Sequence, residues 1–245
     1  MATSIQSIRE IVSTQASAVA VLERFDIDLC SHANESLTQA CAGLQLSVEQ
    51  VLEKLTDAAA NEHGAAPTDL TGYSLSRLIQ HIVRTHHQYV RCELPRLAQM
   101  AQKVAGKHGN RAPELNKVEE LTGLLGGELS AHLQKEEQIL FPFITEMEQD
   151  VAACYAPQRT CFRSVAQPVS MMIVEHGLAE GRVAEIRDLT AGFEPPAWAC
   201  AGYMALYAGL REFAADLRQH VRLENDVLFP RAIDLEAKLN RRTAQ

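Results

Sequence analysis

Apolar residues recur every three or four positions along most of this chain, which is the spacing of amphipathic helices. Short stretches of this pattern fill residues 1–56, and residues 57–73 are small and polar and are broken by Gly64 and Pro67, as in a linker. Four long helical patterns follow, beginning near residues 74, 113, 163 and 197, while the alternation typical of strands is scarce. We therefore predict an all-α protein in which a small helical N-terminal domain (1–56) and a linker (57–73) precede a four-helix bundle (74–240).

Two of the long apolar stripes pass through a histidine and a glutamate. The second helical pattern contains His132 and Glu136 in its stripe, and the fourth contains His220 and Glu224. Residues four apart lie on one face of a helix, so both pairs are expected to point into the core. A histidine on an apolar stripe is most often a core residue, and a His–Glu pair is often a surface ion pair. Two such pairs, both inside the stripe, favour a functional site instead.

The two segments also match each other. HLQKEEQILFP and HVRLENDVLFP share the pattern H-x3-E-x3-L-F-P at a separation of 88 residues. His87 and His176, one on each preceding helix, lie 89 residues apart. The chain is therefore expected to contain two helical hairpins built on a common plan, each with a histidine on its first helix and a His–Glu pair on its second.

Glutamates inside such a core need a compensating charge. A buried carboxylate is costly unless it is paired or bound to a metal ion, and few lysines or arginines fall in these stripes. Two divalent or trivalent ions would supply that charge, since mixed histidine and carboxylate ligands suit iron or manganese and glutamates from two helices can bridge two ions. His108 follows His87 by 21 residues, on roughly the same side of the helix, and adds another imidazole. Helical spacing alone accepts His86 as readily as His87.

With these residues in place, the chain resembles the repair-of-iron-centres family, whose members are di-iron proteins with a hemerythrin-like bundle behind a small N-terminal domain. The resemblance covers nearly the whole chain and is carried by HIVRTHHQYVRCELPRL, KHG, HLQKEEQILFPF, VEHGLAEG and HVRLENDVLFPRA. Alignment on ELPRL selects His87 over His86. The resemblance implies two non-haem iron ions, bridged by carboxylates and by an oxo or hydroxo group. The bridging carboxylates that it implies are Glu136 and Glu224, and the histidine ligands are His87, His108, His132, His176 and His220.

The N-terminal segment matches that family only in part. RFDIDLC resembles the start of the signature of its ScdA-type N-terminal domain, in which two adjacent cysteines and glycines follow a short acidic turn. Here Cys30 is present, but Ser31, His32, Ala33 and Asn34 follow it, so the second cysteine and the glycines are missing. A role that needs two vicinal thiols is therefore not expected, and Cys30 is kept as a single candidate thiol site beside His32.

Composition and charge narrow the classes of function. The formal charge of −8 disfavours a nucleic-acid partner, because an acidic surface repels phosphates. No apolar run approaches the roughly 20 residues that span a bilayer, and the N-terminus lacks a signal sequence, so we expect a cytoplasmic protein without a membrane partner. The six cysteines contain no C-x-x-C pair, and neither a phosphate-binding glycine loop nor a Ser/His/Asp nucleophile set is recognisable.

The resemblance implies a protein of the nitrosative and oxidative stress response that helps to repair damaged iron–sulfur proteins by supplying iron. A second hypothesis is that the same centre binds nitric oxide and lowers its free concentration, which the missing second cysteine favours. An oxygen-binding hemerythrin-type carrier or sensor ranks lower, because the N-terminal domain has no role in it. A metal-free interaction bundle is the remaining alternative. The expected partners are damaged iron–sulfur proteins or nitric oxide. The sequence identifies no substrate of an enzymatic reaction, and it allows a homodimer.

Overall fold

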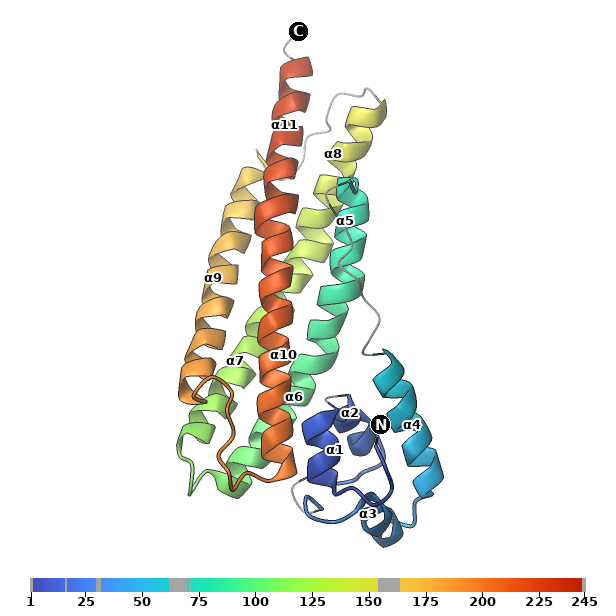
Figure 1. Ribbon diagram of the computed structural model, residues 1–245. Coiled ribbons are helices and arrows are strands. Elements are labelled where there is room, and N and C mark those ends of the chain that lie inside the picture. Colours follow the sequence, from blue (N-terminus) through green and yellow to red (C-terminus); the bar gives the residue numbers. More distant parts are fainter. Residues whose placement is uncertain are drawn as a thin grey trace. The chain divides into compact units, whose positions relative to one another are not determined.

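The computed structural model describes residues 2–15, 17–29, 32–61, 70, 72–153 and 164–243. Within these residues the regular structure is helical apart from one isolated antiparallel bridge between Ser7 and Ser36, which confirms the all-α prediction (Figure 1). None of the described helices is long and apolar enough to cross a membrane. The chain divides into two compact units, a first formed by Met1–Thr68, Gln99–Glu119 and Arg187–Glu212, and a second formed by Asp69–Ala98, Glu120–Ile186 and Phe213–Gln245.

The N-terminal part of the first unit is built from short helices. Ser7 and Ser36 each begin a helix with a capping box, in which the serine hydroxyl and the side chain of the third helical residue satisfy two backbone N–H groups. The helix that follows extends to Asn61, inside the predicted linker, because alanines 58–60 favour helix. These helices are α1 (Ile8–Thr14), α2 (Ala18–Arg24), α3 (Leu37–Gly43) and α4 (Val48–Asn61).

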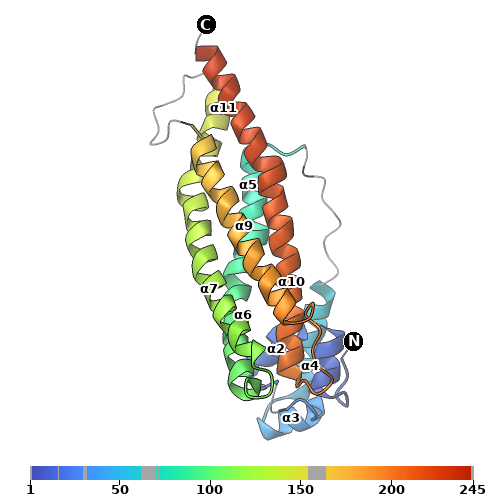
Figure 2. The ribbon, with the colours of Figure 1, turned by 90° about the vertical axis from the view of Figure 1, so that its left-hand side faces the viewer.

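The described residues beyond position 72 form four long helical runs, as the sequence predicts. In both views the parts of these runs that belong to the second unit lie lengthwise beside one another (Figures 1 and 2). The runs are α5 (Leu75–Ile82), η1 (Val83–His87) and α6 (Gln88–His108); α7 (Glu114–Lys135), η2 (Glu136–Leu140) and α8 (Phe141–Ala153); α9 (Ala166–Leu189); and α10 (Ala201–Leu223), η3 (Glu224–Leu228) and α11 (Phe229–Thr243).

Three of these runs contain a π-helical segment at a predicted ligand. His87 ends η1, while Glu136 and Glu224 begin η2 and η3. In η2 the wide turn is visible in the backbone, because the N–H of Phe141 donates to the carbonyl of Glu136, five residues earlier. The repeated Phe-Pro pair follows η2 and η3 directly. A proline cannot donate the next helical hydrogen bond, and a wider turn before it gives its ring room beside the preceding carbonyl.

In both hairpins of the repeat, a glutamate from the second helical run caps the start of the first run. The Glu148 carboxylate on α8 accepts hydrogen bonds from the backbone N–H groups of Leu75 (2.7 Å) and Ser76 (2.9 Å). The Glu236 carboxylate on α11 accepts from the N–H of Val165 (2.8 Å) and from the Ser164 hydroxyl (2.6 Å). Glu148 and Glu236 are 88 residues apart, so the repeat extends to these helix caps.

The apolar core of the second unit lies among the ends of the two hairpins, where α5 and α11 both pack against α8. Leu140, Leu228 and Phe229, which come from the repeated Leu-Phe-Pro motifs, are buried in it. Removing side chains of this size from water stabilises the fold by about 2 kcal/mol each. The motif that ends each His–Glu segment therefore anchors it in the core.

Candidate metal centre

Six of the seven predicted ligands come together in the second unit. They form two groups, and within each group the potential ligand atoms lie within 4.8 Å of one another. We call the first group site A and the second site B. Site A consists of His87, His220, Glu136 and Glu224, and site B of His132, His176, Glu136 and Glu224.

All four helical runs contribute to these two sites. Each run carries one of the four histidines, and the runs that contain η2 and η3 also carry the glutamates. The i, i+4 spacing places His132 and Glu136 on one face of their run, and His220 and Glu224 on one face of theirs. The six side chains are at most 3% exposed, so the polar groups inside the apolar stripes do lie in the interior.

Inside each site the ring nitrogens point toward one another and toward the glutamates. In site A the Nε2 atoms of His87 and His220 lie 3.1 Å apart, and the latter is 3.0 Å from Oε1 of Glu224. In site B the Nε2 atoms of His132 and His176 lie 2.9 Å apart, and the latter is 3.0 Å from Oε2 of Glu224. The two oxygens of Glu136 face both sites, 3.4 Å from Nε2 of His132 and 3.5 Å from Nε2 of His87.

The opposite ring nitrogens show which atoms carry the imidazole protons. Nδ1 of His87 donates to the Glu137 carboxylate at 2.7 Å, and Nδ1 of His132 donates to the Glu175 carboxylate at 2.8 Å. A carboxylate only accepts hydrogen bonds, so both Nδ1 atoms carry hydrogen, and in a neutral ring Nε2 then presents a lone pair to the interior. Such outer carboxylates are typical of metal-binding histidines.

Two observations test whether a metal fits. Two imidazole Nε2 atoms face each other in each site, 3.1 Å apart in site A and 2.9 Å apart in site B, and both oxygens of Glu136 are buried without a hydrogen-bond donor among the residues that the structure describes. No buried residue in the described chain is a lysine or an arginine. Four imidazole nitrogens and two carboxylates form a donor set that suits iron, so the residues fit the ions that the sequence predicts.

The charged groups perturb one another strongly. Burial, reinforced by the Glu224 carboxylate, raises the pKa of Glu136 above its usual range. Burial also acts to raise the pKa of Glu224, but the imidazoles of His220, His176 and His87 outweigh burial and hold the pKa well below the usual value. For His132, burial acts to lower the pKa, but the carboxylates of Glu136, Glu175 and Glu224 together raise it to about 9. The glutamates thus attract positive charge to the centre.

Two further histidines that the sequence analysis considered, His86 and His108, lie outside both sites. His86 is buried, and its Nδ1 donates to Asp216 at 2.8 Å. His108 is the last residue of α6 and belongs to the first unit. Its Nε2 lies 3.2 Å from the Sγ atom of Cys200 in the first unit.

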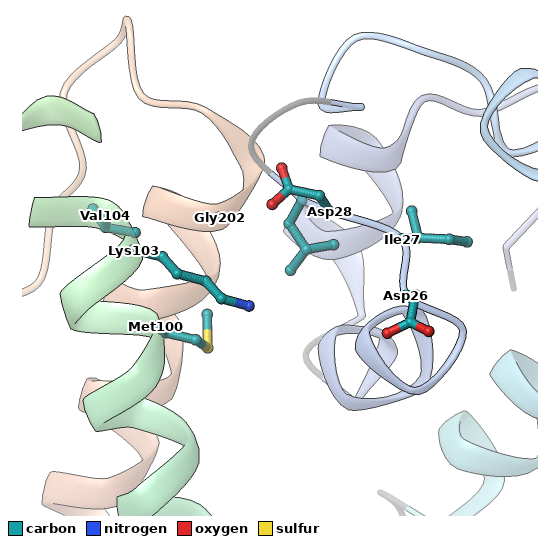
Figure 3. A pocket seen from close by; sticks show the side chains of 8 residues that line it. Asp26, Ile27, Asp28, Met100, Lys103, Val104 and Gly202 are labelled. Carbon is teal, nitrogen blue, oxygen red and sulfur yellow. The ribbon is translucent and has the colours of Figure 1, made fainter. Parts of the chain in front are cut away.

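Cys30 lies outside the described residues, but the segment that leads to it is described. Residues 26–29 line a cavity of about 270 Å³ in the first unit. The side chains of Asp26, Asp28 and Lys103 are among those that line it (Figure 3). Asp26 has a φ of 55°, in the left-handed region that few residues other than glycine, asparagine and aspartate adopt. The remaining lining residues are Ile27, Leu29, Met100, Val104 and Gly202.

The outer carboxylates were missed by reasoning from apolar stripes, although the repeat contains a signal for them. Glu137 follows Glu136 as Asn225 follows Glu224, and Asn225 accepts from Nδ1 of His176 at 2.9 Å. A comparison of each ligand's neighbour between the two hairpins would therefore have identified these positions.

Comparison with known proteins gives two family matches and a set of relatives. The model of the hemerythrin HHE cation binding domain matches residues 78–232, and the ScdA_N model, described as a domain of unknown function, matches residues 4–59. A "Probable iron-sulfur cluster repair protein" of Haemophilus influenzae is 33% identical over 94% of this chain and 97% of its own length. Two proteins named "Iron-sulfur cluster repair protein YtfE", from Dickeya chrysanthemi and Pectobacterium carotovorum, are 32% and 33% identical over 93% of this chain and 96% of theirs.

Proposed function

Because this chain belongs to the hemerythrin HHE cation-binding family, we propose that it is a non-haem di-iron protein that helps to restore damaged iron–sulfur proteins under nitrosative or oxidative stress by supplying iron. The observation that carries the proposal is the pair of buried sites that share Glu136 and Glu224. The names of the relatives, which align over almost their full length, support repair as the function. Damaged iron–sulfur proteins are then the partners, and a cytoplasmic location stays a prediction.

In this proposal each site holds one iron ion. His87 and His220 would hold the ion of site A, His132 and His176 would hold the ion of site B, and Glu136 and Glu224 would offer ligands to both. Iron bound in this way supplies redox chemistry and coordination positions for a small exogenous ligand. The protein's own residues orient the imidazoles through their outer hydrogen bonds and keep bulk water from the buried glutamates.

The test of repair is recovery of a damaged iron–sulfur enzyme. The iron-loaded protein is added to an enzyme whose cluster has been damaged by peroxide or nitric oxide, and activity is followed against an equal amount of free ferrous salt. We expect faster and more complete recovery with the protein. The Glu136→Gln/Glu224→Gln double variant is the matched control and should give no advantage. Recovery equal to that with ferrous salt would contradict the supply of iron.

Nitric-oxide binding is the second candidate, and the sequence around Cys30 favours it. Ser31 stands where the family signature has its second cysteine, so a repair mechanism that needs two vicinal thiols is not open to this chain. The test is the optical spectrum of the reduced, iron-loaded protein during titration with nitric oxide. Ferrous–nitrosyl bands that saturate near stoichiometric nitric oxide would support capture, and an unchanged spectrum would remove it.

A further inference from the structure

The four candidate ligand histidines differ in the hydrogen bonds that their Nδ1 atoms make. Nδ1 of His87 and Nδ1 of His132 each donate to a carboxylate, and Nδ1 of His176 donates to the amide oxygen of Asn225. Nδ1 of His220 is also buried, but no residue in the described part of the chain accepts a hydrogen bond from it. Site A therefore has one oriented histidine, whereas site B has two.

The sequence repeat explains why Nδ1 of His220 finds no acceptor in the part of the chain that the structure describes. Glu175, which accepts from His132, directly precedes the ligand His176, and His86 directly precedes the ligand His87. At the position equivalent to the Glu175 carboxylate, the other hairpin thus carries an imidazole.

The His86 ring occupies the space next to His220 without bonding to it. The two rings are nearly parallel, with an interplanar angle of 4° and centroids 5.6 Å apart. Nδ1 of His86 is engaged by Asp216 at 2.8 Å, and its Nε2 is buried without a partner among the described residues. Because the engaged Nδ1 fixes the ring in this stacked orientation, His86 fills the equivalent place but does not fix the His220 imidazole.

The outer carboxylate of each site is paired with one cation. In site A the Glu137 carboxylate is 2.9 Å from Nη2 of Arg91. Burial acts to raise the pKa of Glu137, but Arg91 and His87 outweigh burial and hold this pKa below the usual range. In site B the Glu175 carboxylate pairs with Lys135. One carboxylate–cation pair thus supports each site. The remaining difference is that Nδ1 of His176 has an acceptor, whereas Nδ1 of His220 has none within the described ranges.

We propose that the ion of site A is the weakly held one and the ion that the protein gives up first, because His86 stands where a carboxylate would orient His220. This rests on the proposed function, since it assumes that iron binds at both sites. Outer-shell partners of metal-binding histidines typically change metal affinity by about 10–100-fold. His86 is therefore a positioning residue that sets the lability of one ion.

The experiment is competition with a chelator, read out by ⁵⁷Fe Mössbauer spectroscopy. Protein loaded with ⁵⁷Fe(II) is titrated with a ferrous chelator, and the iron that remains is counted and its spectrum recorded. We expect loss in two steps separated by about 10–100-fold in chelator concentration, with one of two distinct quadrupole doublets disappearing in the first step. Loss of both ions in a single step would overturn the inference while leaving the proposed function intact. Failure to bind iron at all would overturn both.

Two reciprocal variants assign the labile ion to its site. The His86→Glu/Asp216→Asn double variant supplies a carboxylate to orient His220, and the second change removes the Asp216 carboxylate that would repel it. Site A should then hold its ion more tightly, so that the two steps merge. His86→Phe keeps an aromatic ring against His220 and is the matched control, in which the two steps should persist. Glu175→Gln weakens the hydrogen bond that orients His132 in site B. The second ion should then be lost at a lower chelator concentration, so that the two steps merge. A double variant that folds, as judged by helical circular dichroism, and still loses iron in two unchanged steps would contradict the role of His86, as would a Glu175→Gln variant with an unaltered second step.

Discussion

Nε2 of His108 lies 3.2 Å from Sγ of Cys200, and its ring also lies near the rings of Trp198 and Tyr203. This imidazole was predicted to bind iron, by its match to a family ligand position. In the structure its contacts are instead to residues of the first unit, and it belongs to neither site.

We expect the His108→Ala variant to keep the full iron content. The change removes an imidazole that contacts a thiol and two aromatic rings, so it alters the packing of the first unit and not the donor set of either site. Iron per chain after reconstitution is the measurement, with His132→Ala as the comparison that should lose iron. Loss of an ion from His108→Ala would restore this histidine to the ligand set.

The Glu136→Gln variant is expected to lose two-iron loading. Glutamine keeps the shape but removes the negative charge that both sites share, and neutral amides are poorer ligands for iron than carboxylates. Metal analysis of the purified, reconstituted variant checks this. Glu180→Gln, a change of the same kind on the exposed face of α9, should bind iron as the wild type does. Retention of both ions by Glu136→Gln would refute the shared role of this carboxylate.

The Glu148→Gln variant should be less stable near neutral pH by about 1 kcal/mol, the usual value of a helix cap. Burial acts to raise the pKa of Glu148, but its hydrogen bonds from Ser76 and Leu75 outweigh burial and lower it. A carboxyl group whose pKa is lower in the folded state stabilises the protein above its unfolded pKa, here 4.5, and that stabilisation is lost as pH falls through the folded value.

The free energy of unfolding in denaturant, measured at neutral pH and in acid, tests this prediction. The difference between the wild type and Glu148→Gln should shrink as pH falls below about 4.5, because both side chains are then uncharged. Glu146→Gln, on the exposed side of the same helix, should show little difference at any pH. A gap that stays constant down to strongly acidic pH would show that the cap does not act through its charge.

The glycine of the KHG motif is expected to be intolerant of a side chain. A Cβ at Gly109 would lie 2.6 Å from the Ala105 carbonyl oxygen and 2.8 Å from Oδ1 of Asn116, so backbone would have to move. Gly109→Ala should cost about 1–3 kcal/mol of stability, as overpacking does. A Cβ at Gly106, three residues earlier, would meet no described residue within 4 Å outside its own helical turn, so Gly106→Ala should stabilise the helix by about 0.5–1 kcal/mol. Thermal or denaturant unfolding of the two variants compares them directly, and equal effects would contradict the steric argument.

The sequence by itself determined the helical class, the two-hairpin repeat and the two His–Glu pairs that lie in the two sites. These follow from local rules: helical periodicity places His132 with Glu136 and His220 with Glu224 on one face, and a charged residue inside an apolar stripe must be buried with a partner. The repeat then links these pairs to His87 and His176.

Only the tertiary structure decided the rest. Periodicity accepts His86, His87 and His108 alike, because a helix face says nothing about which other helix lies opposite a given turn. The division of the ligands into two sites, the outer acceptors Glu137 and Glu175, and the π segments all depend on how separate helices pack. That packing sets the contacts between residues far apart in the chain. The stacking of His86 on His220 is one such contact.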